Sequence, residues 1–194
     1  MIRFIITSLA ALAALLMASC SNEPTVQKYF VEKSGQKGFM AVDIAPSIIQ
    51  TEKLKLTPEE KTAVNSLHHI NVLVYKADSL NPGILDKEQA SVKSLLKTDK
   101  YDQLIKFNSK EGSGSINTKG EGEHLEEFII YLHQKDNGLG LVRVTGKDMT
   151  PANVMTIAGL ISKGGLDMNQ LKPLQQMMQG TQTQTQAPVT PVKP

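Results

Sequence analysis

The chain has 194 residues, with 21 lysines and arginines against 19 aspartates and glutamates, a single cysteine and no tryptophan. This balance of charge implies no broad attraction to nucleic acid, so we expect no nucleic-acid partner. Aromatic residues make up 5% of the chain, which disfavours stacking platforms for sugars or bases, and the length permits one domain.

The N-terminus has the pattern of a secretory signal. Arg3 precedes an apolar run that extends to Ala18 with two polar interruptions, and small residues stand before Cys20. A positive start, an apolar run of this length and a small-residue processing site predict a leader, residues 1–19, that is removed. As a membrane-spanning helix the run would be too short, because crossing the hydrocarbon core takes roughly 20 apolar residues.

The end of this leader, Leu16-Met17-Ala18-Ser19-Cys20, resembles the lipobox of bacterial lipoproteins, with Met17 in the place of the usual leucine. A thiolate is a strong nucleophile and can accept a diacylglyceryl group before cleavage. We therefore predict that Cys20 is the lipidation site and that its acyl chains hold the protein at a membrane. The mature chain would then have no cysteine for a disulfide, a metal site or catalysis.

Composition divides the mature chain into three parts. Residues 20–28 are polar apart from Cys20 and Val26 and are predicted to be a lipidated tether. Residues 29–178 are predicted to form a single domain. Residues 179–194 are rich in Gln, Thr and Pro and have little to bury, so we expect a disordered tail.

The first half of the domain combines strand and helix signals. A strand is expected at Phe39–Ala45, and Thr57-Pro58 begins a helix that should continue through Leu67. Thr57 is placed to act as its N-cap, and Glu60 is placed to complete a capping box. Residues 68–77 carry apolar side chains on alternate positions of both faces, which predicts a strand buried on both sides.

The middle of the domain is predicted to turn at Asn81–Gly83, after which Asp86 caps a helix. Residues 101–108 are predicted to form a strand. Residues 110–124 contain several glycines, and we expect an exposed loop or an irregular hairpin there.

The end of the domain carries the strongest turn signal of the chain. Asn137-Gly138 lies between two apolar runs and predicts a β-hairpin, because this pair readily takes the positive φ angles that such turns need. Thr150-Pro151 begins another helix by the same cap-then-proline pattern, ended by Gly164-Gly165. Residues 167–178 are predicted to form a short final helix.

Together these elements predict an α+β domain. We expect a two-layer sandwich in which a mixed or antiparallel sheet carries the helices on one face. A ferredoxin-like arrangement is one topology compatible with this order.

The histidines are the main candidates for chemistry. A zinc or copper site or an enzyme would use His68 or His69 together with His133 and Glu123. However, adjacent histidines on a strand point to opposite faces, and the HExxH pattern is absent. We therefore expect no catalytic residue, no cofactor and no metal site.

Two other motifs fail on their context. Ser94 and Lys97 have the SxxK spacing of penicillin-recognising enzymes, but the companion motifs of those enzymes are missing. Residues 140–148 have a glycine and lysine pattern near that of a phosphate loop, but the spacing is wrong and the segment is a predicted strand.

With the strands placed, the chain resembles the small Bacteroidetes lipoproteins grouped as domain of unknown function 4252, from about Phe30 to Ser162. The resemblance implies lipidation, an envelope location and an α+β domain, and it implies no activity. A glycine-rich insert near Gly112–Gly122 and the Gln/Thr tail are departures from the family. The resembling segments are His69–Tyr75, Phe128–Gly138 and Leu141–Gly146 with the helix that follows.

These observations favour a non-catalytic, lipid-anchored cell-envelope module that binds a partner protein or assembles through its sheet. Because Ser21 does not resemble the aspartate retention signal, we expect the periplasmic face of the outer membrane. One alternative is a small-ligand carrier whose apolar cavity is lined by Leu73, Ile129 and Ile157. The other is the His/Glu metal-dependent enzyme described above.

Overall fold

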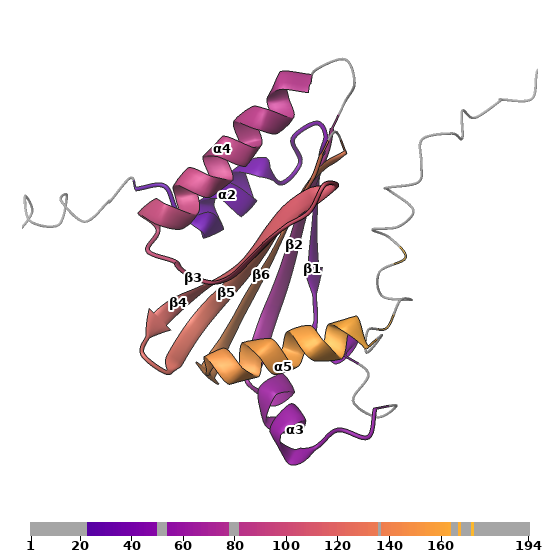
Figure 1. The fold of residues 1–194 in the computed structure, drawn as a ribbon, viewed down its shortest axis with the longest axis vertical. Helices are drawn as coiled ribbons and strands as arrows, with labels where there is room; N and C mark the ends of the chain where they lie inside the picture. The colour runs from indigo at the N-terminus through magenta and orange to yellow at the C-terminus, as the bar shows by residue number, and fades with distance from the viewer. Residues whose placement is uncertain are drawn as a thin grey trace, which may run out of the picture.

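The computed structural model describes residues 23–49, 54–77, 82–135, 137–163, 167 and 172. Within them, six antiparallel strands form one open sheet in the order β1-β2-β6-β5-β4-β3, so the α+β prediction is confirmed (Figure 1). The strands are β1 (Phe39–Ile44), β2 (Leu67–Lys76), β3 (Asp102–Asn108), β4 (Gly112–Glu121), β5 (His124–Gln134) and β6 (Gly138–Met149). The helices are α2 (Val26–Lys33), the short 3-10 helix η1 (Pro46–Ile48), α3 (Pro58–Asn65), α4 (Pro82–Thr98) and α5 (Pro151–Ser162).

The path of the chain explains the strand order. After β2, helix α4 carries the chain to the far edge of the sheet, and four consecutive strands, β3 to β6, return to pair with β2. This order differs from the β-α-β-β-α-β order of a ferredoxin-like domain. The predicted hairpin is the β5–β6 pair, with Gln134 opposite Gly138.

The helix starts with a threonine and a proline are confirmed. Thr57 and Glu60 form the capping box of α3, and Thr150 caps α5 together with Asn153. The prediction that the first of these helices continues through Leu67 is wrong, because α3 ends at Asn65 and Leu67 begins β2 with a buried side chain.

The predicted start of α4 is also wrong. This helix begins at Pro82, at the site of the expected turn, and Asp86 lies inside its first turns with an exposed side chain. Proline is well suited to the first turn of a helix, since its missing N–H has no partner there.

Residues 110–124 are not an exposed loop, and this prediction is wrong as well. They contain β4, which pairs with β3 on one side and β5 on the other. The Ser115, Asn117 and Thr118 side chains of β4 are buried. Two-sided pairing overrides the weak strand propensity of glycine, serine and asparagine, and the segment is integral to the sheet rather than an insert.

Helix α2 begins inside the segment predicted to be a tether. Thr25 caps it, and Val26, Tyr29 and Phe30 are buried at i, i+3 and i+4 spacing. The described chain therefore joins the domain at Thr25, before the predicted boundary at residue 29. Several predictions lie outside the described residues: the leader, the domain end at residue 178, the tail, and the final helix apart from residues 167 and 172.

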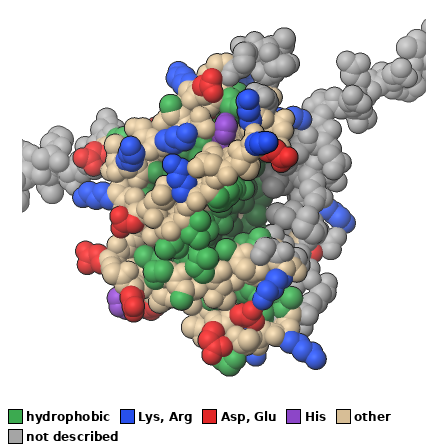
Figure 2. Space-filling view, viewed as in Figure 1, with side chains coloured by type: hydrophobic (Ala, Val, Ile, Leu, Met, Phe, Trp, Pro, Cys, Tyr) green, Lys and Arg blue, Asp and Glu red, His purple; other side chains and the backbone are tan. Residues whose placement is uncertain are grey.

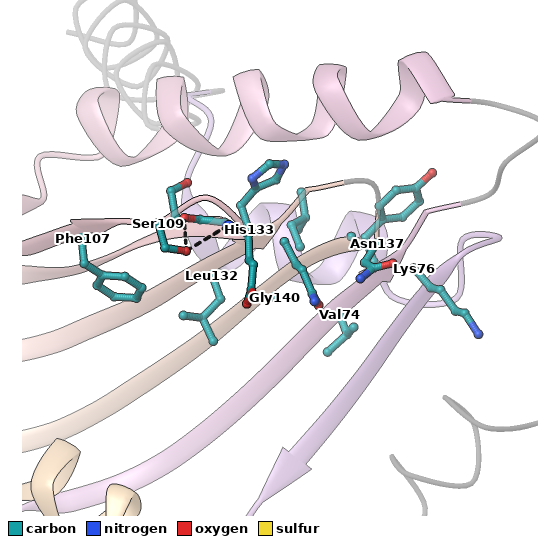
Figure 3. A pocket seen from close by; sticks show the side chains of 15 residues that line it. Val74, Lys76, Phe107, Ser109, Leu132, His133, Asn137 and Gly140 are labelled. Atoms are coloured by element: carbon teal, nitrogen blue, oxygen red, sulfur yellow. Dashed lines mark hydrogen bonds between the residues drawn. The ribbon is translucent and has the colours of Figure 1, made fainter.

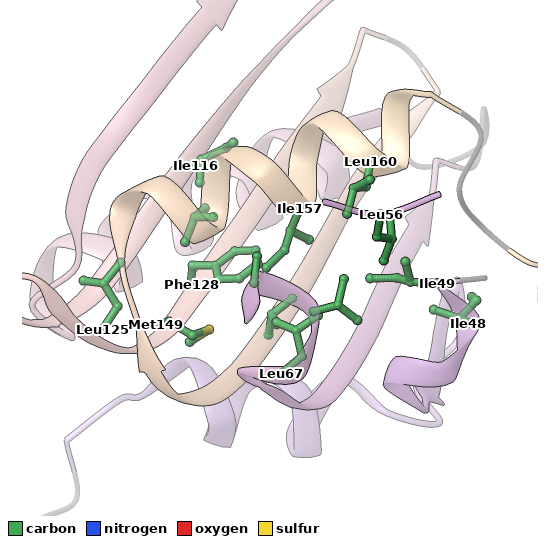
Figure 4. Packing of buried hydrophobic residues seen from close by; sticks show 14 residues of the cluster. Ile48, Ile49, Leu56, Leu67, Ile116, Leu125, Phe128, Met149, Ile157 and Leu160 are labelled. Carbon is green, nitrogen blue, oxygen red and sulfur yellow. The ribbon is translucent and has the colours of Figure 1, made fainter. Parts of the chain in front are cut away.

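The helices cover both faces of the sheet, so the prediction of one helical face is wrong. Strands β2, β5 and β6 carry apolar side chains on both faces, and each face needs a cover. Along β5, Phe128 packs with α3 and α5, whereas Ile129 packs with α2 and α4. We call these two faces the α5 face and the α4 face. Figure 4 shows the core of the α5 face, in which Phe128 and Ile157 meet.

Candidate functional site

The α5 face is apolar at both ends of the sheet, but its helices cover one end. At the covered end, Phe128 and Val144 are 1% and 3% exposed. At the other end, Leu132 and Phe107 are 46% and 47% exposed. Figure 1 shows α5 crossing the strands at one end only.

The strand register aligns the exposed side chains in one row across the sheet. Residues directly opposite each other in an antiparallel pair share a face. The row contains one residue from each strand, and neighbours in it are paired: Met40, Val74, Gly140, Leu132, Gly114 and Phe107.

The middle of this row borders a hollow of about 690 Å³. Polar residues of the strand ends, among them Lys76, Ser109 and Gln134, line part of it. We call the apolar part on the α5 face, Val74, Phe107, Leu132 and Gly140, the groove. Figure 3 shows Val74 and Leu132 pointing away from the helix that covers the opposite face, whereas His133 points toward that helix. In Figure 2 hydrophobic side chains line a hollow in the middle of the visible surface.

Two glycines shape the groove. A Cβ atom at Gly114 would lie 2.2 Å from Cζ of Phe107, so the absence of a side chain lets this ring lie against β4 and form one wall. A Cβ atom at Gly140 would meet nothing within 4 Å, so this position is open floor. A side chain at Gly140 would therefore project into the groove.

On the α4 face, toward the end of the sheet opposite the groove, the strands carry a polar network. Arg143 donates from Nη2 to Glu127 Oε2 (2.7 Å) and from Nη1 to Asn71 Oδ1 (3.4 Å). The Asn71 amide in turn donates to Asp43, and the Tyr101 hydroxyl donates to the other oxygen of Glu127. Burial, followed by the contact with Glu127, raises the pKa of Tyr101. Among the described residues the buried Nε of Arg143 has no hydrogen-bond partner, but both Nη atoms of Arg143 and both oxygens of Glu127 are engaged, so we interpret this network as structural.

A second buried pair fixes α2 to α4. Glu88 of α4 is 5% exposed and accepts from the Tyr29 hydroxyl (2.8 Å) and from Lys33 Nζ (2.6 Å). Burial and the neighbouring Glu88 raise the pKa of Tyr29. Because both carboxylate oxygens are engaged, this pair also serves packing rather than proton transfer.

The histidines proposed for a metal or catalytic site do not converge. His69 pairs with Thr145 of β6 and His133 pairs with Leu139 of the same strand, six residues away, which corresponds to about 20 Å along the strand. Glu123 precedes β5 at the His124 end, far from His133. No group of three or more potential metal ligands occurs among the described residues. The hypothesis of a site built from His68 or His69, His133 and Glu123 is therefore wrong.

The proposed carrier cavity fails for a different reason. Leu73 and Ile129 belong to the core of the α4 face, and Ile157 belongs to the core of the α5 face. All three are at most 2% exposed, and the sheet separates them. They line no common cavity.

Cys20 lies outside the described residues, so its lipidation stays a prediction. Among the described helices, none combines the length and the apolar character that spanning a membrane requires. The groove was not identified from the sequence. Residues 68–77 were predicted as a strand buried on both sides, and the signal for the groove was the second apolar face of this strand, which needed a cover.

The comparisons with known proteins identify a family. The model described as "Domain of unknown function (DUF4252)" matches residues 29–157, which include all six strands and most of α5. No curated protein and no solved structure matches the chain.

Proposed function

The chain belongs to this DUF4252 family, and we propose that it is a non-catalytic, lipid-anchored module of the cell envelope that binds a partner protein through the groove. In this proposal Cys20 carries the acyl chains, and the domain lies at the periplasmic face of the outer membrane. The observation that carries the binding role is the uncovered apolar row on the α5 face, centred on Leu132.

Physical chemistry favours a covered state of this row. Exposed apolar surface costs about 25 cal/mol for each Å² left in water. Single exposed hydrophobic residues are common on protein surfaces, whereas neighbouring ones in a hollow are typical of binding sites. Val74, Phe107 and Leu132 are neighbours in a hollow, because the register places them in one row with Gly140, where no side chain fills the space.

The test of binding uses paired variants in the native chain. Leu132→Glu places a charge in the groove, and Gly140→Leu fills it. Met155→Glu is the matched control, because Met155 is a large exposed hydrophobic residue (45%) on α5, outside the groove. After crosslinking in intact cells, we expect a partner that is captured by the wild type and the control but lost from both groove variants. Equal capture by all four chains would exclude the groove as the binding site.

The test of anchoring is separate. Mass spectrometry of the protein from cells is expected to find a mature N-terminus at Cys20 carrying diacylglyceryl and further acyl groups, and Cys20→Ser should release the protein from membranes. An unmodified Cys20 in the membrane-bound protein would exclude this anchor.

A further inference from the structure

We propose that the outer surface of helices α2 and α4 rests on a bilayer surface that carries anionic phospholipids. We call the exposed lysines of α4, Lys87, Lys93 and Lys97, the basic surface. The inference rests on the proposed function through the anchor at Cys20, and it deepens that function by naming a second contact between the domain and its membrane.

The first argument is the distribution of charge over the helices. On α2 and α4, four lysines face two acidic residues among the exposed charged side chains: Lys28, Glu32, Asp86, Lys87, Lys93 and Lys97. On α3 and α5, which lie on the other side of the sheet, the exposed charged side chains are Glu59 and Lys61. The excess of positive charge is therefore confined to one helical layer.

The second argument is that the basic surface is not neutralised by its neighbours. Within the described part of the chain, its three lysines form no ion pair. Lys93 and Lys97 are four positions apart on α4, so they lie on one side of the helix and repel each other. Anionic headgroups would relieve this repulsion, and each lysine near such a bilayer strengthens binding about fivefold.

The third argument is the presence of exposed apolar side chains in the same layer. Val31 of α2 is 71% exposed, which makes it the most exposed large hydrophobic side chain in the described part of the chain, and Ile84 of α4 is 41% exposed. Helices that expose both lysines and apolar side chains are typical of proteins that lie at the headgroup region of a bilayer. Val31 and Ile84 would insert between headgroups whose phosphates contact the lysines.

The fourth argument is the place where the chain enters the domain. The Val26 N–H donates to Asp99 Oδ2 (2.9 Å), which joins the start of α2 to the residue after α4 (Figure 1). Lys97 is two residues before Asp99, and Lys87 is ten residues before Lys97, about 15 Å along the helix. The entry point therefore lies at the end of α4 that carries Lys93 and Lys97.

The distance from the predicted anchor is also short. Cys20 is five residues before Thr25, and five residues span at most about 18 Å whatever their conformation. This is about two Debye lengths at physiological salt. Attachment at Cys20 would therefore hold the headgroups at a high effective concentration next to the basic surface.

The first test measures vesicle binding without the anchor. The mature chain with Cys20→Ser keeps both hydrophobic cores, which are built from residues between Val26 and Leu160. One variant of it replaces the three lysines of the basic surface by glutamine. The matched control has the same net charge, because it replaces three exposed lysines near α3 by glutamine: Lys55, Lys61 and Lys147.

We expect the Cys20→Ser chain and the control to co-sediment with vesicles rich in phosphatidylglycerol and not with vesicles of phosphatidylcholine alone. The partition coefficient of the basic-surface variant should be at least about tenfold lower than that of the control. Equal partition of these two variants, whether strong or weak, would overturn the proposal. Equal binding of the Cys20→Ser chain to both kinds of vesicle would also overturn it.

The second test measures which side of the attached domain meets the bilayer. The mature chain has no tryptophan and no cysteine besides Cys20, so it can be coupled through Cys20 to a maleimide lipid and carry one tryptophan as a reporter. In vesicles rich in phosphatidylglycerol, brominated acyl chains should quench Val31→Trp several-fold more than Met155→Trp. Met155 is the matched position, because it is exposed on α5, on the other side of the sheet. Equal quenching would contradict the proposal.

The proposed function and this inference fail in different ways. If Cys20 carries no acyl group in cells but the lysines of the basic surface govern vesicle binding, the anchor is wrong and the inference stands. If Cys20 is acylated but substitution of these lysines changes nothing, the anchor stands and the inference is wrong. Capture of a partner through the groove should be the same in the basic-surface variant and the control.

Discussion

The sheet has two ends that the helices do not cover, one on each face, and their side chains differ in kind. On the α4 face this end carries Arg143, Glu127 and Asn71, which are joined by hydrogen bonds from the two Nη atoms of Arg143. On the α5 face the corresponding region carries Leu132 and Phe107, each nearly half exposed. The polar groups are largely buried and hydrogen-bonded, whereas the apolar side chains are left in water. This exposed apolar surface is the feature on which the proposed partner contact rests.

Both ends belong to the same strands, which makes the contrast sharper. In β6, Arg143 follows Val142, and in β5, Leu132 follows the buried Tyr131. Alternation along a strand sends neighbours to opposite faces. The same strands therefore place hydrogen-bonded polar residues on one face and exposed apolar residues on the other.

The largest expected effect separates the covered and open ends of the α5 face. Phe128→Ala should lower the free energy of unfolding by about 3–5 kcal/mol, because it leaves a cavity in a filled core. Leu132→Ala should cost less than about 1 kcal/mol if water covers Leu132 in the free protein. Urea unfolding of both variants measures the two values.

An intermediate effect is expected at the polar end. Replacing Arg143 by Met should cost about 1–3 kcal/mol, because Glu127 and Asn71 each lose a donor in a partly buried site. The Arg143 and Glu127 side chains are 17% and 12% exposed, which makes the contact more than a surface pair. Thermal unfolding of the variant measures the loss, and partner capture should be unchanged. A loss of capture would show that the polar end, rather than the groove, contacts the partner.

The smallest expected effect is a dependence on alkaline pH. Tyr29 and Tyr101 have a raised pKa in the folded chain, from burial and from Glu88 and Glu127 respectively. Above about pH 10 the unfolded chain loses these protons while the folded chain keeps them, so stability falls as pH rises. Below that pH the two residues contribute no slope.

The expected loss is at most about 1.4 kcal/mol per pH unit for each tyrosine. Tyr101→Phe should remove the part of this pH dependence that comes from the polar end. Tyr29→Phe should remove the part that comes from the α2–α4 contact. Urea midpoints measured from pH 9 to 11 test this. An unchanged slope in both variants would exclude the two tyrosines as its source.

Much of the fold followed from local sequence patterns. Thr57 and Thr150, each followed by proline, located two helix starts, and Asn137-Gly138 located the hairpin because these residues act through local backbone geometry. The failures included β4 and α2. The glycines and serines of β4 become a strand only because β3 and β5 pair with it, which is a tertiary effect.

The groove could not be predicted from the sequence for a related reason. Val74 and Leu132 have the alternation of buried strand residues, and the pattern does not reveal how far a covering helix extends. The histidine hypothesis failed because residue types alone do not fix where along the sheet each side chain lies: His69 and His133 pair with residues of β6 that are six positions apart.

The position of the N-terminal helix has a consequence for how the domain would be presented. Thr25, where the described chain enters the domain, caps α2 on the α4 face, and the groove opens on the reverse side of the sheet. A molecule suspended by the residues before Thr25 would turn the groove outward, free of whatever holds it. The point of attachment and the groove would then lie on opposite faces of the sheet.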